Sequence, residues 1–182
     1  AAYVDLSREA AGLAATTGDP AMQLVCERSL AASLYHVGRF AESLAVSDRA
    51  LARPPDNPRL GVEMWGFSPY TYLVATRGYV LSLMGRPAEG HPELERAAQL
   101  AREHDEPELR AYTYTFRVVH AEIIGDRNAA IRLARRAVAL GERTGIHSSR
   151  VLAWHVLAVA HLLHGEYADA AIAAEQSLAI SR

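Results

Sequence analysis

The chain has 182 residues, of which 50% are hydrophobic and 22% are charged, so it can bury the core of an ordinary domain and does not have a disordered composition. Its net charge of −2 argues against a general polyanion-binding protein, and its single cysteine, Cys26, excludes an internal disulfide. All 19 basic side chains are arginines. The absence of lysine excludes a Walker-type phosphate-binding loop, because that motif requires one.

Glycine and proline residues divide the chain into segments with apolar positions at helical spacing. No segment alternates for long enough to predict a strand, so we expect an all-α fold with about nine helices. Asp19-Pro20 and Ser68-Pro69 each offer an N-cap residue followed by a proline suited to the first helical position. Clustered prolines predict an irregular connection over residues 53–67. In chain order, the predicted helices cover residues 3–16, 20–37, 40–52, 69–84, 87–104, 107–124, 127–143, 147–164 and 167–181.

A step of 40 residues relates glycines that follow successive apolar stretches. Gly38 fits one period earlier if the proline-rich connection is a seven-residue insertion. Small residues at fixed places allow two antiparallel helices to approach closely, and stacked pairs bury a face that one pair cannot bury alone. The repeat positions that we assign in this way are Gly38, Gly78, Gly85, Gly125, Gly165, Ala97 and Ala137.

The stretches Gly-Arg-Phe-Ala-Glu-Ser-Leu at 38–44 and Gly-Glu-Tyr-Ala-Asp-Ala-Ala at 165–171 resemble the tetratricopeptide repeat, or TPR. The resemblance implies an α-solenoid of stacked antiparallel helix pairs, forming a single domain over residues 1–182. The step of 40 exceeds the usual TPR period of about 34 residues, which implies longer helices. The implied pairs lie near 20–52, 69–104, 107–143 and 147–181, after a leading helix at 3–16.

Three further stretches are similar to the C-terminal repeat region of bacterial multidomain nucleotide cyclases. They are Gly-Phe-Ser-Pro-Tyr at 66–70, Arg-Gly-Tyr-Val-Leu at 77–81 and Leu-Met-Gly-Arg-Pro at 83–87. Related arrays occur in ATP-dependent transcriptional regulators. The resemblance implies a segment of a larger, cytoplasmic signalling protein whose catalytic and nucleotide-binding domains lie elsewhere, so no active-site residue is carried onto this chain.

In the TPR arrangement, the first helix of each pair lines a concave face. Tyrosine suits a binding surface there, because it combines a large contact area with a polar tip. Packing of the same tyrosines between helices is an equally weighted alternative. The register places toward the groove Tyr35, Tyr72, Tyr79, Tyr112, Val119, Glu122, His155 and Val159.

Arg77 and Arg117 lie one period apart, at a position where the repeat pattern usually has an apolar residue. A charge there must reach water or find a partner. We therefore predict either exposed side chains or salt bridges between helices, with Glu63 or Glu122 as acceptors.

The sequence offers little support for metal or cofactor binding. His161 and His164 are three residues apart on a predicted helix, and Glu166 or His155 could supply a third ligand, but the spacing matches no metal motif. A nucleophile elbow also fails at Tyr70, where the motif needs glycine. We expect no metal, no cofactor and no enzyme activity in this segment.

The predicted helix at 127–143 carries a group of arginines. Nucleic-acid binding would favour further basic helices and interleaved aromatic residues, and Glu142 together with the acidic overall balance argues against it. We interpret the group as a solvated helix face. Its members are Arg127, Arg132, Arg135, Arg136 and Arg143.

These features predict a non-catalytic scaffold that binds a protein segment, or another domain of its parent chain, through the concave face. The alternative is a regulatory domain that senses a small ligand in an enclosed pocket. A third possibility is a homodimer formed through apolar faces left open at the ends of the array, such as the helix at 167–180. The longest apolar stretch, 151–163, is too short to span a bilayer, so we expect no membrane partner.

Overall fold

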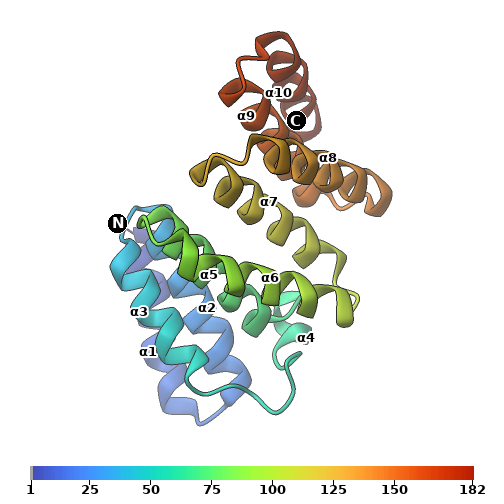
Figure 1. Cartoon of the computed structure of the whole chain (residues 1–182). Helices are drawn as coiled ribbons and strands as arrows, with labels where there is room; N and C mark the ends of the chain where they lie inside the picture. The colour runs from blue at the N-terminus through green and yellow to red at the C-terminus, as the bar shows by residue number, and fades with distance from the viewer. Residues whose placement is uncertain (1) are drawn as a thin grey trace. The chain divides into compact units, whose positions relative to one another are not determined.

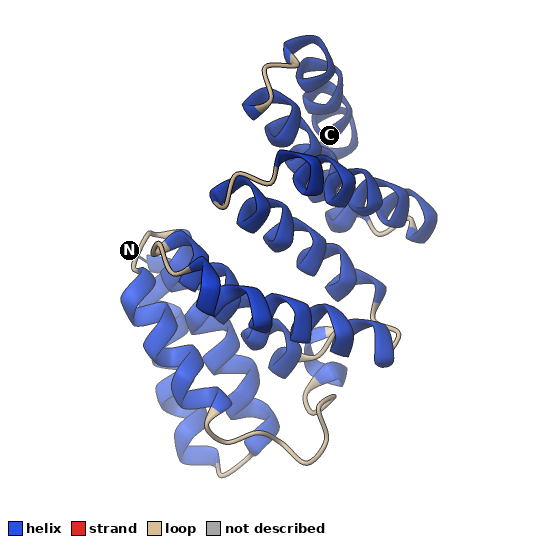
Figure 2. Ribbon diagram, in the orientation of Figure 1, coloured by secondary structure: helices blue, strands red, loops and turns tan. Residues whose placement is uncertain are grey.

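The computed structural model describes residues 2–182, and within that range every regular element is an α-helix (Figures 1 and 2). The proline at the start of several helices has a fixed φ that suits the first turn, where its missing N–H costs nothing. The helices are α1 (Ala2–Thr17), α2 (Pro20–His36), α3 (Phe40–Leu51), α4 (Val62–Trp65), α5 (Pro69–Leu83), α6 (Pro87–Glu103), α7 (Pro107–Ile123), α8 (Arg127–Thr144), α9 (His147–Leu163) and α10 (Tyr167–Ser181).

The all-α prediction is confirmed, and the nine predicted helices are present with small shifts at their ends. The predicted caps also form: the Asp19 carboxylate accepts a hydrogen bond from the Ala21 N–H at 2.8 Å, and the Ser68 hydroxyl accepts one from the Thr71 N–H at 3.0 Å. The count of nine was one too low among the described residues. The four-residue helix α4 lies in the segment predicted to be irregular, because so short a helix leaves no periodic pattern in the sequence.

The four repeat glycines that follow α2, α5, α7 and α9 share one turn. Each has a positive φ between 77° and 80°, a conformation that glycine adopts without the steric cost of a Cβ. In each turn, the N–H of the residue after the glycine donates to the carbonyl five positions earlier, as in a Schellman motif. These bonds join Arg39 to Leu34, Arg86 to Leu81, Asp126 to Ala121 and Glu166 to His161, at 2.9–3.0 Å.

The described residues form two compact units, one ending at His104 and the other running from Asp105 to Arg182. In the first unit, α2 packs against α1, α3 and α5, and α5 packs against α3 and α6. Leu44, Val80 and Leu81 form a buried cluster of this unit, with Tyr35 and Phe40 packed against it. Helices α2 and α5 therefore lie side by side, which brings their aromatic side chains together.

The second unit contains α7 to α10. Helix α9 packs against α7, α8 and α10, so it holds the unit together. The core contains mostly alanine and valine, whose small volumes allow close helix packing. Its buried members are Val118, Ala121, Ala130, Ala134, Val156, Leu157, Ala158, Ala160 and Ala173.

The alanines assigned to repeat positions are completely buried: Ala97 and Ala137 both have 0% exposure. Gly78 of α5 lies against Gly90 of α6, the position that the 40-residue step relates to Ala130 and Ala170. Small residues therefore stand at contacts within helix pairs in both units.

Arg77 forms salt bridges between helices, as one of the two sequence interpretations predicts, but the acceptors were wrong. Its Nε lies 2.7 Å from Asp48 Oδ1 of α3, and its Nη1 lies 3.1 Å from Glu93 Oε1 of α6. Neither Glu63 nor Glu122 is its partner, because the rotation of α5 directs the side chain toward α3 and α6.

Along the described chain, no helix combines the length and the apolar character needed to cross a membrane.

Candidate functional site

The first unit has an aromatic cluster built around Arg28. Arg28 and Tyr35 are seven residues apart on α2, and Tyr72 and Tyr79 are seven apart on α5, so each pair shares one face of its helix. The Tyr35 and Tyr72 hydroxyl groups share a hydrogen bond of 3.1 Å. The Tyr35 and Tyr79 rings meet edge to face, with centroids 5.7 Å apart. The structure thus brings together three of the predicted groove residues.

Arg28 is the functional candidate that the sequence analysis missed. Its guanidinium carbon lies 4.2 Å from the Trp65 ring centroid, 4.0 Å from that of Tyr72 and 5.5 Å from that of Phe67. Only 6% of Arg28 is exposed, and its buried Nε has no hydrogen-bond partner among the residues described. Its seven-residue spacing from Tyr35 is a signal in the sequence, but Arg28 does not stand out without knowledge of α4.

Helix α4 positions one side of this cluster. It is bracketed by Gly61 and Gly66, which both have a left-handed backbone conformation, so the chain turns sharply before and after it. The short helix presents Trp65 with 40% of its surface exposed, whereas Tyr72 is only 2% exposed. The guanidinium therefore contacts both a buried ring and a ring that reaches solvent.

The burial of the cluster changes its titration. Burial raises the pKa of Tyr35 well above its ordinary range, and the neighbouring Tyr72 adds to the rise. Burial also raises the pKa of Tyr79. The pKa of His36 is lowered by burial first and by the Arg28 charge second. At neutral pH Tyr35 and Tyr79 thus stay protonated and can donate hydrogen bonds.

The other predicted groove residues lie in the second unit. Tyr112 on α7 is partly buried, and His155 on α9 is exposed. Glu122 lies at the end of α7, where its Oε1 is 3.7 Å from His164 Nε2. Burial raises the pKa of Glu122, although the charges of His164 and Arg127 act in the opposite direction.

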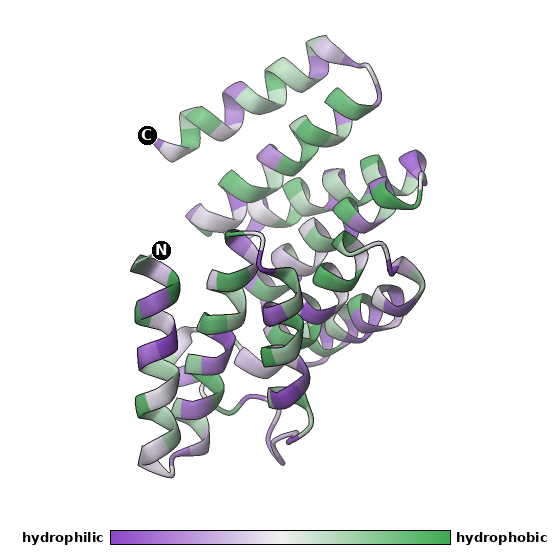
Figure 3. Cartoon of the chain, turned by 90° about the vertical axis from the view of Figure 1, so that its left-hand side faces the viewer, coloured by the Kyte–Doolittle hydropathy of each residue, from purple (hydrophilic) through white to green (hydrophobic). Residues whose placement is uncertain are grey.

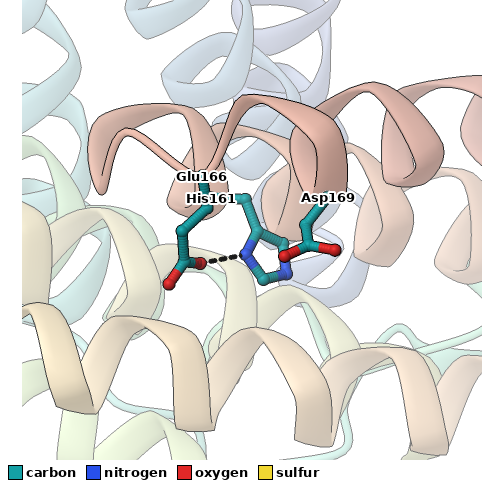
Figure 4. Close-up of side chains that lie close together, drawn as sticks. All are labelled: His161, Glu166 and Asp169. Atoms are coloured by element: carbon teal, nitrogen blue, oxygen red, sulfur yellow. Dashed lines mark hydrogen bonds and ion pairs between the residues drawn. The ribbon is translucent and has the colours of Figure 1, made fainter.

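A second cluster joins His161 of α9 to Glu166 and Asp169 at the start of α10 (Figure 4). His161 Nδ1 lies 2.5 Å from Glu166 Oε2, and this hydrogen bond lowers the pKa of Glu166. One atom from each residue lies within 4.8 Å of the others, and no other trio of this kind occurs among the described residues. His164 does not join it, since it faces Glu122. With one nitrogen and two exposed carboxylates, the cluster lacks the four nitrogen or sulfur ligands of a structural zinc site.

Comparison with known proteins identifies the fold. A search with protein-family models finds no match, and a search of curated proteins finds none either. Solved structures do match. One is a crystal structure from Podosopora anserina, described as a putative kinesin light chain with nearly identical TPR-like repeats. It aligns with a TM-score of 0.59 and 19% identity, over 98% of this chain and 85% of that chain. A second crystal structure, of a variant of that protein, aligns with a TM-score of 0.62 and 19% identity, over 97% and 84% of the two chains.

The chain has a TPR-like fold. The structural likeness confirms the predicted fold class of stacked antiparallel helix pairs. In the first unit, α2 and α5 carry Arg28, Tyr35, Tyr72 and Tyr79, and α4 carries Trp65. We call these five residues the α2/α5 cluster.

Proposed function

We propose that this chain is a non-catalytic scaffold that binds a segment of another protein, or of another domain of its parent protein, at the α2/α5 cluster. The observation that carries the proposal is the guanidinium of Arg28, buried against aromatic rings with its Nε lacking a hydrogen-bond partner in the part of the chain described. A buried charge costs free energy unless it is paired, so this site favours a ligand that brings a carboxylate.

The geometry selects the kind of segment. The guanidinium of Arg28 lies over the rings of Trp65 and Tyr72, and a carboxylate would bind at its edge, where two parallel N–H donors fit the two oxygens. The exposed part of Trp65 offers an apolar surface beside that position. A segment with an acidic side chain next to an apolar or aromatic one satisfies both features.

A display library of random peptides tests this proposal. We expect the selected peptides to be enriched in acidic residues, and to lose at least about tenfold in affinity when Arg28→Met or Trp65→Ala is introduced, since charge-assisted bonds and aromatic anchors carry most of such binding. Arg102→Ala, at an exposed position of α6, is the matched control and should bind as the unmodified chain does. Trp65→Ala is the safer variant because the ring is already exposed. Selected peptides that bind both variants normally would refute the site.

We further propose that the parent is a bacterial signalling protein, with a nucleotide cyclase as the first candidate and an ATP-dependent transcriptional regulator as the second. The support is the similarity of the stretches at 66–70, 77–81 and 83–87. In either parent, the scaffold would act in the cytoplasm. Sequencing the gene around this segment tests the proposal, because a cyclase or nucleotide-binding ATPase domain should be encoded beside it.

A small-ligand sensor is the alternative function, and one pocket in the first unit favours it. The pocket has a volume of about 450 Å³, within the usual range for small-molecule sites. Glu27 at its wall accepts hydrogen bonds from Arg49 and Arg53 at 3.4 and 3.1 Å. Thermal-shift screening with a metabolite library tests it: a ligand that stabilises the chain but not its Gln23→Trp variant, in which the pocket is filled, would favour the sensor.

Self-association is a further proposal, supported by the outer surface of α10. Figure 3 shows hydrophobic residues at intervals along this helix, and Tyr167, Ile172 and Leu178 are 70%, 57% and 58% exposed. Apolar side chains at this density favour contact with a second surface. Sedimentation velocity should show a dimer that the double variant Ile172→Glu/Leu178→Glu abolishes, whereas Gln176→Glu, which adds a charge at a polar exposed position, leaves it intact. A monomer at all concentrations would refute the proposal.

A further inference from the structure

The second unit contains a pocket between α7 and α8 that no feature of the proposed scaffold uses. Its volume is about 270 Å³, smaller than most sites for drug-sized molecules. Arginine and tyrosine side chains form its polar wall, and alanine and leucine form its apolar part. The lining residues are Arg110 and Tyr114 from α7, and Arg136, Ala139, Leu140 and Arg143 from α8.

Helical spacing brings these side chains together. Arg136 and Arg143 are seven residues apart, and therefore lie on one face of α8. Arg110 and Tyr114 are four residues apart on α7, the helix that packs against α8. Residues of both stripes line the same pocket, so three arginines border one small space.

Two acidic residues of α7 and α8 are engaged away from this pocket. Glu142, the one carboxylate of α8, accepts hydrogen bonds from Arg150 Nε at 3.1 Å and from Trp154 Nε1 at 2.8 Å, both on α9. Glu108, near the start of α7, accepts one from Ser148 at 3.1 Å. Glu142 argues in the sequence against a basic function of this helix, but in the structure its carboxylate is bound to side chains of α9.

Two of the other arginines of α8, Arg127 and Arg135, provide a contrast. The charges of Arg127 and Arg135 act on Glu122 and Glu166, respectively, and so have acidic neighbours. None of the three pocket arginines forms an ion pair with any residue from 2 to 182. Their mutual repulsion is therefore uncompensated within the unit, and a bound anion would relieve it.

We propose that the α7/α8 pocket binds a phosphoryl group. A phosphoryl dianion offers three oxygens, which matches three guanidinium groups better than a single carboxylate does, and arginine forms paired hydrogen bonds to such oxygens. The Tyr114 hydroxyl can donate a further bond. Ala139 and Leu140 supply apolar contact for the carbon atoms that carry the group. This site is separate in residues and chemistry from the α2/α5 cluster.

Two probes test the site at constant ionic strength: inorganic phosphate and O-phosphoserine. We expect saturable binding by calorimetry, weakened at least about tenfold in Arg110→Ala, Arg136→Ala and Arg143→Ala, because each removes a charge-assisted donor. Arg132→Ala is the matched control: it removes an exposed arginine of the same helix outside the pocket, and should leave the affinity within about twofold.

The comparison of probes distinguishes the sources of the group. Equal affinity for both shows that the phosphoryl group alone is recognised, as for a free metabolite, whereas tighter O-phosphoserine binding shows that the pocket also contacts its carrier, as for a phosphorylated side chain. Tyr114→Phe gives a second readout in a variant that keeps the charge and the ring. Absence of saturable binding, or an equal loss in Arg132→Ala, overturns the proposal, since the effect would then be general electrostatics.

Discussion

Gly78 of α5 and Gly90 of α6 touch backbone to backbone. A Cβ placed on Gly78 would lie 2.8 Å from the Gly90 carbonyl oxygen and 2.9 Å from Leu94 Cγ. A Cβ on Gly90 would collide with the Gly78 carbonyl oxygen, which already accepts a hydrogen bond from the Ser82 hydroxyl at 2.9 Å. This contact sets how closely the two helices of the second TPR-like pair approach.

Alanine at either glycine should therefore destabilise the fold. We expect Gly78→Ala or Gly90→Ala to lower the free energy of unfolding by about 1–3 kcal/mol. The added Cβ would meet a backbone carbonyl oxygen of the facing helix, so the two helices must separate to make room. Gly12→Ala is the control: its Cβ meets nothing within 4 Å, so the substitution should stabilise α1 by up to about 1 kcal/mol. Urea denaturation measures all three. Unchanged stability in both interface variants would contradict the close contact.

A different set of glycines, those that follow α2, α5, α7 and α9, explains why the sequence predicts so much of this fold. Glycines and prolines end helices through local backbone rules, and their regular spacing therefore predicts the helices and the repeat. By contrast, α4 is too short for periodicity, and it alone brings Trp65 over Arg28. The partners of Arg77 depend on the rotation of α5 about its axis, which spacing along the chain does not specify. For this reason the predicted tyrosines were found together, whereas the charge between them was missed.

The salt bridges of Arg77 should contribute measurably to the stability of the first unit. Its side chain is 27% exposed and joins two carboxylates from different helices, so we expect Arg77→Leu to lower the free energy of unfolding by about 1 kcal/mol. Arg86→Leu is the comparison, since Arg86 pairs within one turn with Glu89 and is 44% exposed. That variant should lower stability less than Arg77→Leu does. Equal effects in thermal and urea denaturation would contradict a bridging role for Arg77.

Alkaline pH should destabilise the chain through Tyr35. Burial raises the pKa of Tyr35 in the folded state, whereas an unfolded tyrosine ionises near its ordinary value of about 10. Above that pH the unfolded state binds fewer protons, so the free energy of unfolding falls as pH rises toward the folded-state pKa. The missing lysines leave mainly tyrosines and Cys26 to titrate there, and the pKa of Cys26 is also raised by burial.

Urea denaturation from pH 8 to pH 11, in a Cys26→Ala background, measures this effect. Tyr35→Phe should weaken the dependence of stability on pH, although it also removes the hydrogen bond to Tyr72 and so lowers stability at every pH. The slope, and not the absolute stability, is therefore the readout. Tyr167→Phe is the control because Tyr167 is 70% exposed and should leave the slope unchanged. Identical slopes for all three proteins would show that Tyr35 ionises freely in the folded state.

Zinc should not stabilise the cluster at the α9–α10 turn. His161 Nδ1 is hydrogen-bonded to Glu166, and a metal there would gain one nitrogen and two carboxylates that otherwise face water. That ligand set is weaker than the sites that hold structural zinc. We expect the same melting temperature with and without added Zn²⁺, both for the unmodified chain and for Asp169→Asn. A saturable rise in the melting temperature that Asp169→Asn removes would instead establish a metal site, with His161, Glu166 and Asp169 as its ligands.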